Sequence, residues 1–221
     1  MKDGEPRDEI ELAVFSLIER GLRELSTAAN SEQVSQLTRL VMLLSEWAGR
    51  ISLTGHRDPL EMAGQLVLDA AALSEALPEL ETASRLTDLG SGVGFPGLPI
   101  AILRPDLEVV LVESRLKRHH LQREARRRLG LTHVHPVLGR SNEVEILPSD
   151  VVVAQAMTQP DQALELMGPW ARPGGLVALP ASEESDRPTL PVGFKDLSLR
   201  GYQVPETGRV RKLWVARVTG S

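Results

Sequence analysis

The sequence contains no cysteine among its 221 residues, and aromatic residues make up only 3% of it. Without cysteine the chain has no disulfide bond, no thiolate nucleophile and no cysteine metal site. So few aromatic rings disfavour a platform on which several nucleic-acid bases stack. No hydrophobic run is long enough to span a bilayer, and no apolar signal core follows Met1. We therefore expect a cytoplasmic protein that has no membrane segment.

The five histidines form no evident catalytic or metal-binding set. His133 and His135 would share one face of a strand, but no third ligand is evident near them. His56 is expected in a surface loop, and the Gly-Ser-Gly segment at residues 90–92 lacks the spacing of a nucleophile elbow. We therefore predict neither a bound metal ion nor a serine nucleophile.

Positive charge is in deficit overall but concentrated in one segment. The net charge of −5 and the pI of about 5.6 disfavour an obligate polyanion binder. A local basic patch is still compatible with this total, because electrostatic attraction depends on how charge is distributed. Residues 115–128 favour a helix whose buried stripe is Leu116, His120, Leu121, Ala125 and Leu129. Its outward cations either bind RNA phosphates or form a solvated face. They are Arg115, Lys117, Arg118, Arg123, Arg126, Arg127 and Arg128.

Helical and extended patterns divide the chain near residue 80. Apolar spacing predicts helices over residues 9–26 and 32–48, and a third from Pro59 to about Leu77 with Asp58 as its N-cap. Strands are predicted over residues 84–89, 108–113, 133–137, 149–154, 176–179 and 213–218. Strands that alternate with helices indicate an α/β fold with a doubly wound, mostly parallel sheet. We expect a helical N-terminal portion, residues 1–80, followed by an α/β domain, residues 81–221.

A glycine-rich loop follows the first predicted strand, where residues 87–97 read Thr-Asp-Leu-Gly-Ser-Gly-Val-Gly-Phe-Pro-Gly. In an open α/β sheet, ligands bind outside the carboxyl ends of the strands, and glycines let a ligand lie against bare backbone. Gly92, Gly94 and Gly97 also match the dinucleotide fingerprint G-x-G-x-x-G. Asp88 favours S-adenosylmethionine, because a carboxylate attracts its ammonium and sulfonium groups but would repel a pyrophosphate. The loop therefore predicts a class I, Rossmann-like methyltransferase domain.

Further cofactor contacts are predicted where the next two strands end. Glu113 ends the second strand, where an acid accepts hydrogen bonds from ribose hydroxyls. Asn142 and Glu143 follow the third strand, where polar groups edge the adenine. The alternatives are a solvated strand end and a short polar loop without a ligand. The predicted cofactor contacts are Asp88, Gly90, Ser91, Gly92, Gly94, Phe95, Glu113, Ser114, Asn142 and Glu143.

The segment Leu89–Ile102 resembles the signature of the glucose-inhibited division protein B family, which methylates N7 of a guanine in small-subunit ribosomal RNA. The continuation Phe95–Pro99, Phe-Pro-Gly-Leu-Pro, is more specific to that family than the glycines are. The resemblance runs from about residue 35 to the end of the chain. Its other matching segments are Trp47, Ile51–Thr54, Asp58–Pro59, Glu61, Leu68–Asp69, Glu113–Ser114, Lys117–Arg118, Gly139–Arg140 and Glu143.

The resemblance implies methyl transfer from S-adenosylmethionine to a guanine N7 in the decoding-region loop of 16S ribosomal RNA, with the small ribosomal subunit as partner. N7 carries a lone pair and no proton, so the reaction requires positioning rather than a catalytic base. Cationic and amide donors could read guanine O6 or hold phosphates. The predicted substrate contacts are Gln155, Lys117, Arg118 and Arg140. We expect the chain to be a monomer.

Four positions on the substrate side depart from the pattern of the resembled family. Leu66 and Ala70 replace a histidine and a serine, Gln155 replaces an arginine, and Pro180 replaces a lysine. Two other hypotheses therefore stay open. One is a paralogue that binds S-adenosylmethionine but is non-catalytic or has another substrate. The other is a small-molecule methyltransferase on the same scaffold.

Overall fold

The N-terminal part of the computed structural model is helical, and the structure describes residues 5–48, 57–155, 158–182 and 185–219. Its helices are α1 (Glu5–Glu24), α2 (Ser31–Ala48), and a longer helix made of α3 (Pro59–Met62), the π-helical turn η1 (Ala63–Val67) and α4 (Leu68–Glu75). Asp58 caps the longer helix by accepting a hydrogen bond from the Leu60 amide at 3.1 Å. All three predicted helices and the cap are confirmed. The matching segment at residues 51–54 and His56 lie outside the described residues.

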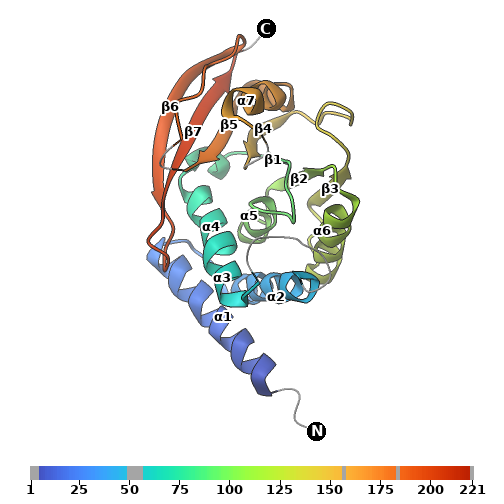
Figure 1. The fold of residues 1–221 in the computed structure, drawn as a ribbon, viewed down its shortest axis with the longest axis vertical. Coiled ribbons are helices and arrows are strands. Elements are labelled where there is room, and N and C mark those ends of the chain that lie inside the picture. Colours follow the sequence, from blue (N-terminus) through green and yellow to red (C-terminus); the bar gives the residue numbers. More distant parts are fainter. Residues whose placement is uncertain (1–4, 49–56, 156–157, 183–184, 220–221) are drawn as a thin grey trace.

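A seven-stranded sheet forms the centre of the molecule, in the order β3-β2-β1-β4-β5-β7-β6 (Figure 1). The strands are β1 (Arg85–Leu89), β2 (Glu108–Glu113), β3 (Val134–Leu138), β4 (Ser149–Ala154), β5 (Ala171–Ala181), β6 (Phe194–Gln203) and β7 (Val210–Val218). β1 to β5 are parallel, and β7 is antiparallel to both of its neighbours. This confirms the predicted fold class. The strand order reverses between β1 and β4, which is where ligands bind in open α/β sheets.

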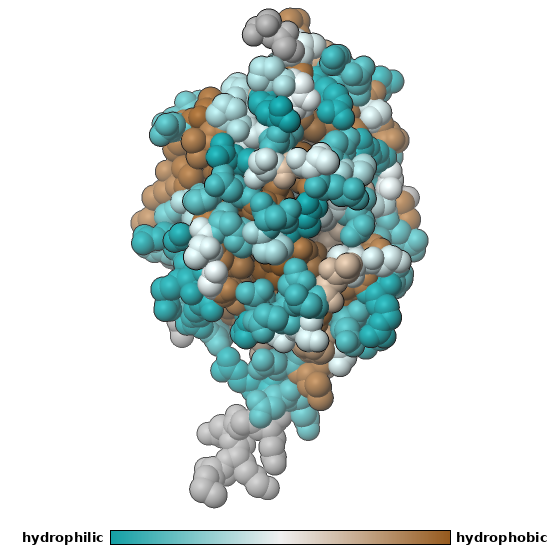
Figure 2. Space-filling model, turned by 180° about the vertical axis from the view of Figure 1, so that it is seen from behind, coloured by the Kyte–Doolittle hydropathy of each residue, from teal (hydrophilic) through white to brown (hydrophobic). Residues whose placement is uncertain are grey.

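Helices cover both faces of the sheet, but unequally (Figure 1). The N-terminal helices, α5 (Gly97–Leu103) and α6 (Leu116–Leu129) pack on one face, and α7 (Pro160–Met167) with the short helix η3 (Gly168–Trp170) packs on the other. Alternation along each strand explains the two cores. Val109 and Leu111 face the larger one, whereas Val110 and Val112 face the smaller. Hydrophilic residues cover most of the rear of the molecule (Figure 2).

The N-terminal helices share a core with the sheet. Val14 of α1 belongs to the same buried cluster as Leu86 of β1. Gln33 of α2 also donates two side-chain hydrogen bonds to the carbonyls of Ile102 and Leu103, at 2.9 and 3.1 Å. These carbonyls lie at the end of α5, where a helix leaves its own carbonyls without helical partners. The predicted border near residue 80 therefore lies within η2 (Pro78–Glu81), just before β1, and the two portions that it separates share one packed core.

Three features of the sheet region differ from the sequence expectation. β6 and α7 were not predicted. β5 begins at Ala171 rather than Leu176, because the Pro-Gly-Gly segment that indicated a turn forms an irregularity inside the strand. Gly174 there has φ +77°, a conformation that glycine adopts readily. No helix in the described ranges is long and apolar enough to cross a membrane.

Candidate active site

The glycine loop joins β1 to α5 at the carboxyl edge of the sheet. Gly90, Gly92 and Gly94 have φ angles of 68°, 58° and 99°, which residues with a side chain rarely adopt. At Gly94 an added Cβ would also lie 2.3 Å from Cδ1 of Leu98. The loop therefore presents backbone rather than side chains to whatever binds in front of it.

Asp88 lies fully buried behind this loop. Its Oδ2 accepts a hydrogen bond from the Gly97 amide at 2.9 Å, and its Oδ1 is buried with no partner among the described residues. Burial raises the pKa of this carboxyl to about 7; the Gly97 N–H acts against the shift, and the charge of Glu113 adds to it. Asp88 thus holds the loop from within and, once ionised, gives the site negative charge without lining a cavity.

Gln122 of α6 fixes the other side of the loop. Its buried Nε2 donates to Ser91 Oγ at 2.8 Å and to the Gly92 carbonyl at 2.7 Å. Ser91 Oγ in turn donates to the carbonyl of Val112, at 3.2 Å. Sequence reasoning missed Gln122. The one signal for it was an uncharged amide inside an otherwise cationic helix.

The position of Gln122 also corrects the predicted buried stripe of α6. Three residues of that stripe are buried: Leu121, Ala125 and Leu129. Leu116, however, is 53% exposed and His120 is exposed, whereas His119 and Gln122 are buried. The helix is rotated so that Gln122 faces the glycine loop. The same rotation places Leu116 on the exposed side of the helix.

Glu113 ends β2 with its side chain only 5% exposed. Oε1 accepts a hydrogen bond from the Arg115 amide at 2.7 Å, and Oε2 lies 3.8 Å from Nη1 of Arg118. Nη1 of Arg118 also lies 3.8 Å from where a Cβ on Gly92 would be. Arg118, a predicted substrate contact, thus lies between Glu113, the predicted ribose acceptor, and the glycine loop.

A cavity of about 320 Å³ opens in front of the loop, within the size range of small-molecule sites. It is lined by Gly90, Val112, Ser114, Gly139, Arg140, Ser141, Asn142, Thr158, Gln162 and Leu166. Arg140, predicted as a substrate contact, is therefore on the same wall as Asn142. Its Nε lies 3.9 Å from Oε1 of the exposed Glu143. Trp170, buried under this wall, donates from Nε1 to the Ser141 carbonyl at 3.1 Å.

A second recess borders Phe95 and Pro96, at the end of the glycine loop. It is narrow and is lined by Gln65, Leu66, Asp69, Ala70, Leu73, Phe95, Pro96, Gln155 and Tyr202. Gln155 also borders an adjoining cavity of about 260 Å³, whose lining includes Pro180 and Arg211. The structure thus brings together the four positions that depart from the resembled family.

Arg211 is the cation of this second area. Its Nη2 lies 2.5 Å from Oδ2 of Asp69, and the two side chains are only 16% and 8% exposed. Burial raises the pKa of the neighbouring Tyr202, and the negative charge of Asp69 raises it further, so the phenol stays neutral. Asp69, which lines the narrow recess, thus pairs with a permanently charged guanidinium that lines the adjoining cavity.

A family model described as rRNA small subunit methyltransferase G, GidB, matches residues 33–187. The chain belongs to this family. A protein of Chromohalobacter salexigens named ribosomal RNA small subunit methyltransferase G is 32% identical, over 89% of this chain and 93% of its own length. Another of that name from Stenotrophomonas maltophilia is 33% identical, over 94% and 96%. The fold is that of a SAM-dependent methyltransferase from Aquifex aeolicus, with a TM-score of 0.53, 17% identity, and coverage of 72% of this chain and 93% of the other.

Six of the predicted site residues line one of these cavities. Gly90, Ser114, Arg140 and Asn142 line the first cavity. Gln155 lines the narrow recess and its neighbour, and Phe95, predicted as a cofactor contact, lines the narrow recess with it. Lys117 is exposed on the first turn of α6 and lines neither area. Arg211 was missed by the sequence reasoning because nothing in its own strand distinguishes it from other arginines.

Proposed function

We propose that this chain transfers the methyl group of S-adenosylmethionine to N7 of a guanine in the 16S ribosomal RNA of the small subunit. One observation carries the proposal: a loop of three positive-φ glycines fronts a small-molecule cavity and is backed by a buried acid. Membership of the small-subunit methyltransferase family supplies the class of substrate.

Cofactor binding is assigned to residues of the α/β portion, 81–221. When bound, S-adenosylmethionine supplies a methyl group on a positively charged sulfonium. Gly90, Ser114 and Asn142 would hold it, because they line the cavity with backbone, hydroxyl and amide groups. Asp88 and Glu113 give this edge of the sheet negative charge, which suits a cationic ligand and disfavours a pyrophosphate.

Guanine binding is assigned to the narrow recess lined by Pro96 and Gln155 and to the adjoining cavity lined by Gln155 and Arg211. Guanine presents N7 and O6 as adjacent acceptors. The amide of Gln155 can donate to O6, and Arg211 can donate to O6 or to a phosphate. N7 loses no proton on methylation, so these groups act by orienting the base and excluding water, with no proton transfer. The proposed acting form is one copy of the chain on the small subunit.

Titration calorimetry with S-adenosylmethionine, followed by methyl transfer to small subunits that lack the modification, tests the proposal. We expect binding, and we expect 7-methylguanosine in the nucleosides of the digested RNA. Binding without transfer would instead indicate a paralogue with another substrate. An absence of binding would contradict the cofactor assignment itself.

A further inference from the structure

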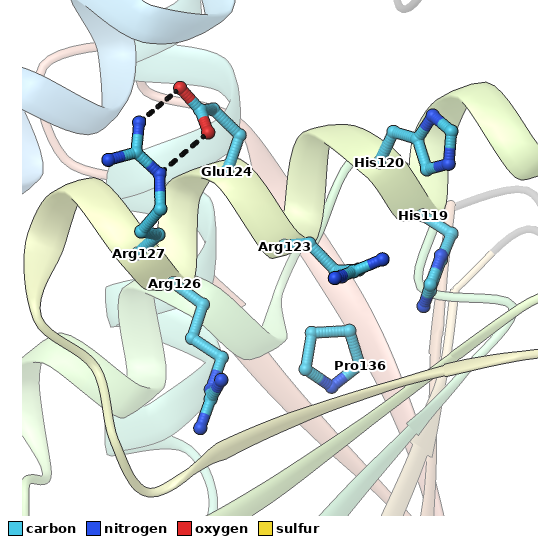
Figure 3. A pocket seen from close by; sticks show the side chains of 7 residues that line it. All are labelled: His119, His120, Arg123, Glu124, Arg126, Arg127 and Pro136. Carbon is cyan, nitrogen blue, oxygen red and sulfur yellow. Dashed lines mark hydrogen bonds and ion pairs between the residues drawn. The ribbon is translucent and has the colours of Figure 1, made fainter.

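A third cavity lies along the outer side of α6, against the edge strand β3, with a volume of about 640 Å³. It is lined by His119, His120, Arg123, Glu124, Arg126, Arg127 and Pro136 (Figure 3). We call it the α6–β3 groove. None of the residues that line the two proposed binding areas borders it. The groove is thus a separate surface.

The one acidic residue that lines the groove is already neutralised. Glu124 accepts hydrogen bonds from Arg127 at 2.9 Å and from Arg128 at 2.6 Å, and these bonds lower its pKa to about 2. In Figure 3 Glu124 and Arg127 lie on one side of the helix, whereas Arg123 and Arg126 extend from the other side toward the strand that carries Pro136. The side chains of Arg123 and Arg126 form no hydrogen bond or ion pair with any residue in the described ranges. Two guanidinium groups are therefore available for an anion.

His119 lines the same groove as Arg123. Its ring is buried, and Nδ1 has no hydrogen-bond partner within the described part of the chain. Burial is the main cause that lowers the pKa of this imidazole; a hydrogen bond with the Pro136 backbone acts against the shift, and the charges of Arg123 and His120 add to it. A bound anion would offset the repulsion from these neighbouring charges.

The spacing of the residues that line the groove suits an extended polyanion. Residues 119, 123 and 126 recur at i+4 and i+3, so they form one row along the helix. Pro136 lies on an edge strand and has no N–H to donate, which disfavours the addition of a peptide strand. The lining contains no phenylalanine, tyrosine or tryptophan on which a base could stack.

We propose that the α6–β3 groove binds the phosphodiester backbone of the ribosomal RNA substrate, at nucleotides other than the methylated guanine. This inference rests on the proposed function. Because the whole chain has a net charge of −5, a local cationic groove would also set the orientation in which RNA approaches. Contacts of this kind position the RNA and do not read its sequence.

The variant Arg123→Gln with Arg126→Gln tests the proposal against a matched control, Arg23→Gln with Arg39→Gln. The control removes the same charge from two arginines that lie outside the groove and pair with Glu19 and Glu32, neither of which lines it. Two probes are used at several salt concentrations: a labelled single-stranded uridine 20-mer, and methyl transfer to unmodified small subunits. S-adenosylmethionine affinity is measured for every variant.

We expect the groove variant to bind the 20-mer about tenfold more weakly, with a salt slope reduced by about 0.7 for each phosphate that the variant no longer neutralises. Its KM for small subunits should rise about tenfold, with kcat and cofactor affinity unchanged, while the control changes by less than threefold. If both variants weaken 20-mer binding equally, or if the groove variant leaves it unchanged, the proposal that RNA binds in this groove is overturned. Competition by polyglutamate as strong as that by RNA would also overturn it, in favour of an acidic protein partner. The wild-type chain could instead bind the 20-mer and methylate no subunits, while the groove variant binds the 20-mer more weakly. That result would support the groove and refute the proposed function alone.

Discussion

The cofactor side and the substrate side of this site are built in different ways. The cofactor side is local: a strand, a loop and a helix that follow one another over residues 85–103. The loop is fixed by positive φ angles, by the hydrogen bond that the Gly97 amide donates to Asp88, and by the bonds that Gln122 donates. The substrate side is assembled from side chains distant in sequence, such as Asp69 and Arg211, which are 142 residues apart.

This difference explains why one side keeps the pattern of its family and the other departs from it. Gly92, Gly94 and Gly97 are constrained by backbone geometry, because a side chain there would strain the chain or collide with its neighbours. A recess lined by side chains tolerates substitution of its residues as long as other residues provide the lost charge and volume. Gln155 and Pro180 carry no charge where the resembled family has arginine and lysine, and Arg211 places a cation beside both.

Gly94→Ala should produce the largest effect, because it forces a side chain into the loop against Leu98. We expect S-adenosylmethionine affinity to fall more than a hundredfold in calorimetry, together with a lower melting temperature. The matched control is Gly174→Ala, which has φ +77° but nothing within 4 Å of the added Cβ. The control should cost only about 1–2 kcal/mol of stability and leave binding unchanged. Equal losses for both variants would mean that strain alone, and not the loop, explains the result.

Arg211→Gln combined with Asp69→Asn should come next. The double variant avoids leaving Asp69 as an unpaired buried charge, which costs about 3–5 kcal/mol. We expect kcat/KM for small subunits to fall about a hundredfold, a loss of roughly 2.7 kcal/mol of transition-state stabilisation, with cofactor affinity within twofold of wild type. Lys195→Gln, an exposed position of β6 in the same hairpin that lines neither recess, is the control. A parallel loss of cofactor binding would contradict the independence of the two sides.

Asp88 should make cofactor affinity depend on pH. Its pKa is raised from 3.8 to about 7, so the carboxyl becomes charged only above neutral pH in the unliganded protein. We expect affinity to rise about tenfold between pH 6 and 8, with proton release on binding near pH 7. Asp88→Asn keeps an acceptor for the Gly97 amide but should abolish this dependence. A pH-dependent affinity that survives in the variant would assign the effect to another group.

The same shift has an opposite consequence for stability. A carboxyl whose pKa is raised by folding contributes stability that is fully present below its unfolded pKa of 3.8 and is lost as the pH rises through about 7. The unliganded protein should therefore lose stability between about pH 4 and 7. Asp88→Asn should flatten that decline in urea unfolding.

Asp58→Ala should have the smallest effect. It removes the N-cap of the long helix that carries Leu66, Asp69 and Ala70, and costs about 1 kcal/mol of stability. KM for small subunits should rise by less than threefold, and cofactor affinity should not change. A change in cofactor affinity alone would show that this helix supports the glycine loop instead.

Sequence reasoning reached furthest where the structure is local. The strands that precede and follow the glycine loop were predicted within about one residue. β2 contains the continuous apolar run Val109–Val112, which is typical of a buried parallel strand. β6 was missed because its ten residues are all exposed or only half-buried and include five that are charged or polar, so it carries no clear two-residue period. Gln122 and Arg211 were missed because each acts on residues that only the folded chain brings near.

The two hydrogen bonds from Gln33 to the carbonyls of Ile102 and Leu103 have a consequence for shortening this protein. These bonds cap the C-terminus of α5, the helix that begins at the glycine loop. A residue of α2 thus stabilises the end of the segment that is proposed to bind the cofactor. A shortened chain that starts at residue 81 would leave those carbonyls to water and expose the apolar underside of α5. Although the helical portion contributes nothing to the cofactor cavity itself, its removal is expected to cost the shortened enzyme its binding loop.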